Sequence, residues 1–189
     1  MSIFEYLATI VAIVLGLATA NLLNKFSRVI VNINWKSLGW FFSLWCLLLL
    51  ICLLGYFWSF WRLYSGVEEF SIWEFILVPF VSVVCFFLIS VFLPVPEDFQ
   101  KNVDPSEYFL EFRKPFYVTL TILWLHFGIM PFVIEFQQNS FEIAFGWLMV
   151  IISFSGVFIK TIRSHKFLVL AFSISFLSQE AIQLGISSM

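Results

Sequence analysis

Six long apolar runs, separated by short polar segments, dominate the pattern of this chain. Each run is close to the roughly 20 residues that a helix needs to cross a bilayer. The pattern therefore predicts an all-α fold, a polytopic transmembrane helical bundle that forms a single domain over residues 1–189. The expected spans lie at about 4–24, 38–61, 72–94, 115–135, 141–160 and 167–187.

Nine of the ten basic residues gather in three clusters, and these clusters occupy alternate connecting segments. Arg62 is the exception. The positive-inside rule places such clusters on the cytoplasmic side of a membrane. With six spans, we expect a multi-pass protein of the inner (plasma) membrane with both termini outside. The three clusters are Lys25, Arg28 and Lys36; Lys101, Arg113 and Lys114; and Lys160, Arg163 and Lys166.

Aromatic residues support the same topology, because their amphipathic rings prefer the headgroup level of a bilayer. Trp45 and Trp124 lie deeper in their runs and are predicted to pack inside the bundle. The inner-interface set is Trp35, Trp40, Tyr108 and Tyr117, and the outer set is Tyr6, Trp58, Trp61, Tyr64, Trp73 and Trp147.

The composition excludes several classes of protein. The chain is 61% hydrophobic and 12% charged, which is too little charge to cover a soluble surface. Short connecting segments leave no room for a separate soluble domain. A net charge of −2, with no basic patch interleaved with aromatics, argues against nucleic-acid binding. The thiols of Cys46, Cys52 and Cys85 all fall in apolar runs and are expected to be buried and structural.

One connecting segment, residues 95–114, is long enough to hold structure of its own. Its stretch 104–107, Asp-Pro-Ser-Glu, is a helix-start signal, since Asp can cap and Pro suits the first helical position. We expect either a short helix at the cytoplasmic interface, separated from the fourth span by Pro115, or an inner extension of that span. The sequence leaves both open.

Small residues recur every four positions along the first span, at Ala8, Ala12, Gly16 and Ala20, and Asn24 continues the series. Small side chains let two helix backbones approach closely. The stripe therefore predicts a helix-packing surface. Another span of the same chain is the favoured partner, and a second copy in a homo-oligomer is the alternative.

The first span also carries a resemblance. Phe4-Glu5-Tyr6, then Ile-Val-Ala-Ile-Val-Leu-Gly over 10–16 and Leu17-Ala18, resemble the start of a group of small uncharacterised bacterial multi-spanning inner-membrane proteins. The basic turn 160–166 is similar as well, and elsewhere the likeness is one of layout. The resemblance implies a bacterial inner-membrane setting and no particular activity.

Ionisable groups inside spans are functional candidates, because each is costly in lipid. His126 lies in the fourth span, and Glu180 lies in the sixth between Gln179 and Gln183. A histidine–carboxylate pair there would suit proton relay or cation binding. The alternative is a structural role, with His126 hydrogen-bonded to a neighbouring helix and Glu180 close to the headgroups.

No catalytic motif, phosphate-binding loop or metal-ligand spacing is present in the sequence, so we expect neither an enzyme nor a cofactor or metal. The favoured function is a membrane effector or accessory subunit, of the kind found in bacterial stress or defence systems, coupled to a soluble protein partner at the cytoplasmic face. The alternative is a small transporter or channel that uses His126 and Glu180.

Overall fold

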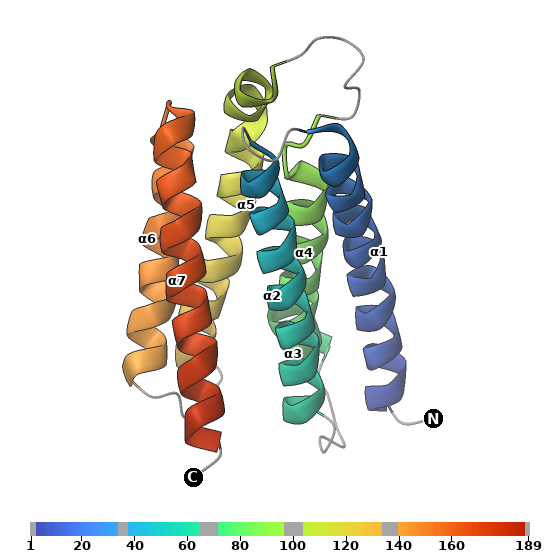
Figure 1. Ribbon diagram of the computed structural model, residues 1–189. Coiled ribbons are helices and arrows are strands. Elements are labelled where there is room, and N and C mark those ends of the chain that lie inside the picture. The colour runs from blue at the N-terminus through green and yellow to red at the C-terminus, as the bar shows by residue number, and fades with distance from the viewer. Residues whose placement is uncertain (1–2, 34–37, 65–71, 97–103, 134–139, 188–189) are drawn as a thin grey trace.

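The protein is an all-helical bundle (Figure 1). The computed structural model describes residues 3–33, 38–64, 72–96, 104–133 and 140–187, and this part of the chain contains no strand. The fold class is therefore confirmed as all-α. The helices are α1 (Ile3–Asn32), α2 (Trp40–Tyr64), α3 (Ile72–Phe75), the π-helical turn η2 (Ile76–Phe80), α4 (Val81–Phe92), α5 (Pro105–Val133), α6 (Ser140–Phe158) and α7 (Ile162–Ser187).

Two of these helices are long and apolar enough to cross a membrane. They are α1 over Phe4–Asn32 and α2 over Trp40–Arg62, with mean hydropathies of 2.1 and 2.2. Two further apolar helical segments, Val81–Phe92 and Ile143–Phe158, are shorter. A membrane location is compatible with this pair, and the full set of six spans stays a prediction.

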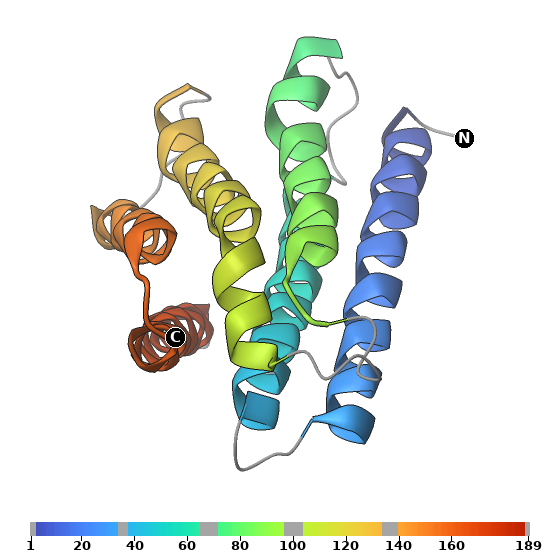
Figure 2. The ribbon, with the colours of Figure 1, turned by 90° about the horizontal axis from the view of Figure 1, so that it is seen from above.

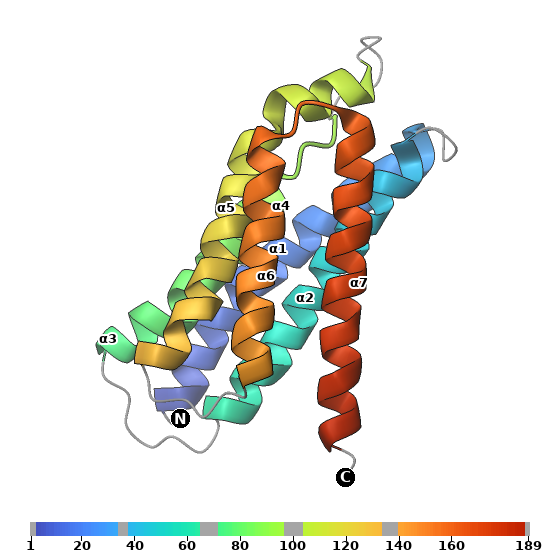
Figure 3. The same ribbon diagram turned by 90° about the vertical axis from the view of Figure 1, so that its left-hand side faces the viewer.

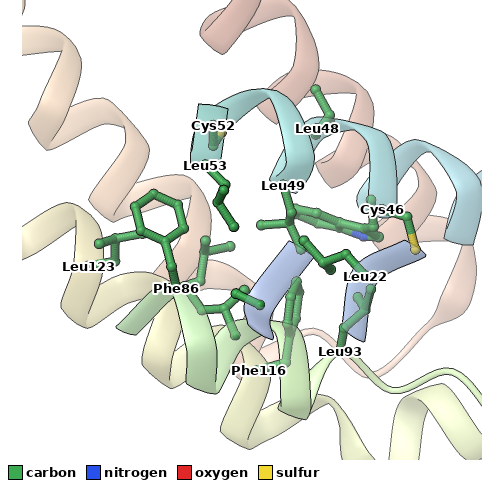
Figure 4. Packing of buried hydrophobic residues seen from close by; sticks show 14 of the residues in the cluster. Leu22, Cys46, Leu48, Leu49, Cys52, Leu53, Phe86, Leu93, Phe116 and Leu123 are labelled. Atoms are coloured by element: carbon green, nitrogen blue, oxygen red, sulfur yellow. The ribbon is translucent and has the colours of Figure 1, made fainter. Parts of the chain in front are cut away.

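The helices pack as a ring in the order α1, α4, α5, α6, α7 and α2, each on its two neighbours. Seen along the bundle, α1 and the α6–α7 pair lie on opposite sides (Figure 2). Trp45 of α2 reaches across, with its ring centroid 5.1 Å from that of Phe116 in α5 and 5.2 Å from that of Phe172 in α7. Figure 4 shows Leu22 and Leu49 in the same buried cluster. As predicted, Trp45 and Trp124 are packing residues, and all three cysteines are buried free thiols.

Buried positions on α1 alternate by three and four residues. This is a heptad repeat, which keeps one narrow stripe of the helix facing α2 and α4. The stripe consists of Phe4, Ala8, Val11, Leu15, Ala18, Leu22 and Val29.

The third predicted span is irregular. Residues 72–94 hold α3, η2 and α4 in succession, and Pro79 lies inside the π-helical turn. Proline lacks the N–H that a regular ladder needs, so the helix changes its hydrogen-bonding pattern there. The Tyr56 hydroxyl of α2 donates to the Pro79 carbonyl at 3.0 Å.

The end of α4 is held by a lysine from another helix. Leu93 is extended, with φ −56° and ψ 112°, as expected for a residue that precedes proline. The Nζ of Lys25 in α1 donates to the carbonyls of Val91 and Leu93, at 2.6 Å each. A cation at a helix C-terminus satisfies carbonyls that have no helical partner.

The helix start at residue 104 is confirmed. The Ser106 N–H donates to Oδ1 of Asp104 at 2.7 Å, and Pro105 is the first residue of α5. A break at Pro115 is not found, because α5 continues to Val133. The extension alternative is thus correct, although the first turns of α5 cross the end of the bundle before the helix turns down into it (Figure 3). Pro115 lacks the N–H that would bond the Glu111 carbonyl one turn earlier, and both residues are exposed, so the helix can bend there.

One end of the bundle collects the basic residues, and we call it the basic end. Here α1 and α6 end and α5 and α7 begin, while α1 begins and α7 ends at the opposite end (Figure 1). Lys36 and Lys101 lie outside the described residues. The described members of the basic end are Lys25, Arg28, Arg113, Lys114, Lys160, Arg163 and Lys166.

Candidate functional site

The helix phase does not favour the predicted pair of His126 and Glu180. Trp124 marks the face of α5 that meets α7, since its ring centroid lies 6.1 Å from that of Phe172. His126 comes two residues later, about 200° round the helix, and is half-buried. The pair stays a prediction.

Glu180 lies on the inner side of α7. It is one turn beyond the buried Phe176, is half-buried, and is close enough to Cys52 of α2 for its charge to act on that thiol. Gln179 is half-buried beside it, and the side chain of Gln183 lies outside the described part of the structure. Glu180 therefore lies within electrostatic reach of α2.

Three of the four residues in the predicted packing stripe on α1 do not pack against another helix of the described chain. Ala8 is buried, whereas Ala12, Gly16 and Ala20 are exposed, and a Cβ built on Gly16 would have no atom within 4 Å. The reason is geometric: a repeat of four residues drifts by about 40° per step round an α-helix. Over three steps the stripe leaves the core face. Contact with a second copy stays a prediction.

A buried tyrosine–histidine pair lies at the basic end instead. The hydroxyl of Tyr117 in α5 and Nδ1 of His165 in α7 are 3.0 Å apart, and the two rings are stacked. The other ring nitrogen, Nε2, lies 3.2 Å from the carbonyl oxygen of Ile159. Because a carbonyl only accepts, Nε2 carries the proton and donates. The unprotonated Nδ1 then accepts from the tyrosine hydroxyl.

Burial keeps this histidine neutral. His165 has no exposed surface and lies just before the sixth predicted span. Loss of hydration is the main reason that its pKa is lowered to about 4. The hydrogen bond to Ile159 raises the pKa, and the nearby charge of Arg113 lowers it further. At neutral pH the chain Tyr117–His165–Ile159 is thus an uncharged relay of hydrogen bonds.

The relay is fixed by tight packing on all sides. The Phe109 ring meets the His165 ring edge-on at 5.1 Å, and the Trp45 ring meets that of Tyr117 at 6.0 Å. On the α6 side, Gly156 leaves the space that the Tyr117 ring occupies, because a Cβ there would stand 2.7 Å from its Cγ. Any larger residue at position 156 would collide with the ring.

Two further cations complete the basic end. Arg113 is buried, one turn before Tyr117 on the same face of α5, and its Nη1 donates to the Leu110 carbonyl. The Nζ of Lys166 lies over the Trp40 ring, 5.8 Å from its centroid, which is a cation–π contact.

The sequence pattern missed this site for two reasons. Tyr117 was expected in the inner aromatic belt, yet it is fully buried. His165 belongs to a basic stretch expected to be a turn between spans, whereas α7 begins at Ile162 and includes it. No local sequence pattern could have shown the contact, because Tyr117 and His165 are 48 residues apart.

Among the described residues, no group of three or more histidine, cysteine, aspartate or glutamate side chains is arranged to hold a metal ion. The likeness of the first span to bacterial multi-spanning proteins stays a prediction. Comparisons with protein-family models, curated proteins and solved structures find no match for this chain.

Proposed function

We propose that this chain is a multi-pass inner-membrane protein that acts as an effector or accessory subunit, with its basic end in the cytoplasm. The supporting observation is the outer surface of the bundle. Large apolar side chains are exposed on every long helix, which is unfavourable in water and suits lipid. One example from each of α1, α2, α4, α5, α6 and α7 is Ile13, Leu54, Val91, Ile122, Ile151 and Ile174.

The charge distribution supports the orientation. Apart from Arg62, the described cations gather at one end of the bundle, and α1 begins and α7 ends at the other (Figure 1). By the positive-inside rule, the start of α1 and the end of α7 then lie outside the cell. The basic end is also the face that a soluble partner would meet, because it would then face the cytoplasm.

Cysteine labelling tests this arrangement. After replacement of the native cysteines, single cysteines at positions 34, 102 and 164 should be shielded from an impermeant thiol reagent in intact cells. Cysteines at positions 65 and 138 should react. The reverse pattern would contradict the orientation, and extraction of the protein by alkaline carbonate would contradict a membrane-spanning bundle.

Reconstitution separates the accessory role from transport. The buried interior described above is packed by aromatic rings, so we expect proteoliposomes containing only this chain to hold a proton or cation gradient as well as empty liposomes do. A flux that disappears in Glu180→Gln, with unchanged expression and thermal stability, would contradict the accessory role. It would establish the small transporter or channel alternative.

A further inference from the structure

Among the described residues, Arg113 is a buried cation without a counter-charge. Only 8% of its surface is exposed, its Nε has no hydrogen-bond partner, and the described residues offer it no ion pair with a carboxylate. Its single hydrogen bond runs from Nη1 to the Leu110 carbonyl. Burying a guanidinium costs several kcal/mol unless an opposite charge or a full set of acceptors compensates. An unsatisfied buried donor needs a physical explanation, and an anion bound here would satisfy the donor and compensate the charge together.

The side chains around Arg113 do not supply that partner. Its charge acts on Tyr117 and His165, and both are neutral hydrogen-bonded groups. The nearest acidic residue along α5, Glu111, lies about 200° round the helix and is exposed. Arg113 thus faces uncharged groups on its own side of α5.

More positive charge lies at the adjacent junction of α6 and α7. Lys160 is exposed there and follows Ile159, whose carbonyl oxygen lies 3.2 Å from Nε2 of His165. Arg163 is exposed about 200° round α7 from His165. The junction also begins the 26-residue helix α7. Thr161 precedes its first residue, and the Ser164 N–H donates to Thr161 Oγ1 at 3.4 Å. The first turn of a long helix adds a partial positive charge from its unpaired N–H groups.

We propose that Arg113 anchors a phosphate-binding site at the basic end, with Lys160 and the start of α7 forming its rim. The planar fork of a guanidinium matches phosphate oxygens, and charge-assisted bonds of this type are the strong ones. The phosphate belongs either to an anionic phospholipid or to a free phosphate ion. The lipid source rests on the proposed membrane location, which puts this end at the level of the inner headgroups.

The test compares the thermal stability of the protein in three preparations of lipid nanodiscs at equal ionic strength. The first contains phosphatidylcholine alone, the second adds phosphatidylglycerol, and the third is phosphatidylcholine with inorganic phosphate in the buffer. A ligand that binds only the folded state raises the Tm. A rise of a few degrees in the second preparation alone identifies a lipid headgroup, and a rise in the third identifies free phosphate. No rise in either overturns the site.

Substitutions assign the effect to Arg113. Arg113→Gln should abolish the rise in Tm, whereas Arg62→Gln, the same change in an exposed residue at the opposite end, should preserve it. If Arg113→Gln does not fold, the exposed Lys160→Gln serves instead and should reduce the rise. The site is overturned if the rise is undiminished in both variants, or in Lys160→Gln when only that variant folds.

A second readout comes from His165, which lies within the field of Arg113. A bound phosphate adds negative charge beside the ring, so the pKa of His165, followed by NMR, should rise in the preparation that stabilises the protein. An unchanged pKa there overturns the site even if the Tm rises. Failure to enter nanodiscs would instead overturn the proposed membrane location, so the two failures are distinguishable.

Discussion

Gly156→Ala is the smallest change that should disrupt the tyrosine–histidine pair. A Cβ at position 156 would stand 2.7 Å from Cγ of Tyr117 and nearer still to two other ring carbons. The ring cannot simply move aside, because it is fully buried and lies against Trp45, Phe116 and His165. Either α6 moves away from α5, or the tyrosine changes rotamer and loses its hydrogen bond.

The size of the effect follows from three contributions. Overpacking a closely packed core costs about 1–3 kcal/mol. Loss of the hydrogen bond between Tyr117 and His165 adds about 0.5–1.5 kcal/mol. Alanine offsets about 1 kcal/mol, because it is the better helix former. We expect a net loss of about 1–3 kcal/mol, which for a chain of this length lowers the Tm by about 2–12 °C.

Thermal unfolding in detergent, followed by tryptophan fluorescence, measures the change. Gly16→Ala and Gly55→Ala are matched controls, since a Cβ at either position meets no atom within 4 Å. Their Tm should stay the same or rise. Tyr117→Leu, which shortens the side chain that the new Cβ meets, should make Gly156→Ala less damaging than in the wild-type background. A Tm for Gly156→Ala equal to that of the two controls would refute the reasoning.

Three other predictions concern separate parts of the bundle. Leu15→Phe should lower folded yield more than Gly16→Leu, because Leu15 is buried and Gly16 faces open space; the reverse order would indicate a second copy on the small-residue stripe. Lys25→Met should lower the Tm in a thermal melt by removing two charge-assisted hydrogen bonds at the end of α4, worth about 1.5–3 kcal/mol each, while Arg62→Met should not. Acidification from pH 6.5 to about 4 should destabilise the wild type, because the unfolded state binds a proton that buried His165 excludes; a His165→Gln variant with the same pH dependence of Tm would contradict this.

Apolar run length was enough to predict the helices but not their regularity. Five of the six runs correspond to single helices, because a long apolar segment without internal breaks satisfies its backbone only as a helix. The run at 72–94 folds instead as α3, η2 and α4. This irregularity could not be predicted from the run itself, because the effect of Pro79 depends on neighbours such as Tyr56 of α2. The same limit explains Pro115, which bends a helix that continues through it.

Packing faces were harder to predict than helices. The four-residue repeat and the heptad share Ala8, and the four-residue series has drifted by about 120° round the helix when it reaches Ala20. The core followed the heptad, and the small-residue series drifted to the outside. The pair of Tyr117 and His165 is 48 residues apart in sequence, and it forms only because α5 packs beside the junction of α6 and α7. No local pattern contains that contact.

The basic clusters illustrate how one sequence signal can combine different physical roles. For topology, each lysine or arginine counts alike. In the structure Lys25 caps α4, Lys166 lies over Trp40, and Arg113 is buried, whereas Lys160 and Arg163 are exposed. Removing a whole cluster would therefore change folding and orientation together. Substitutions at Lys160 and Arg163 alter charge at the basic end without breaking a described helix cap or core contact, so these two positions separate orientation and ligand binding from stability.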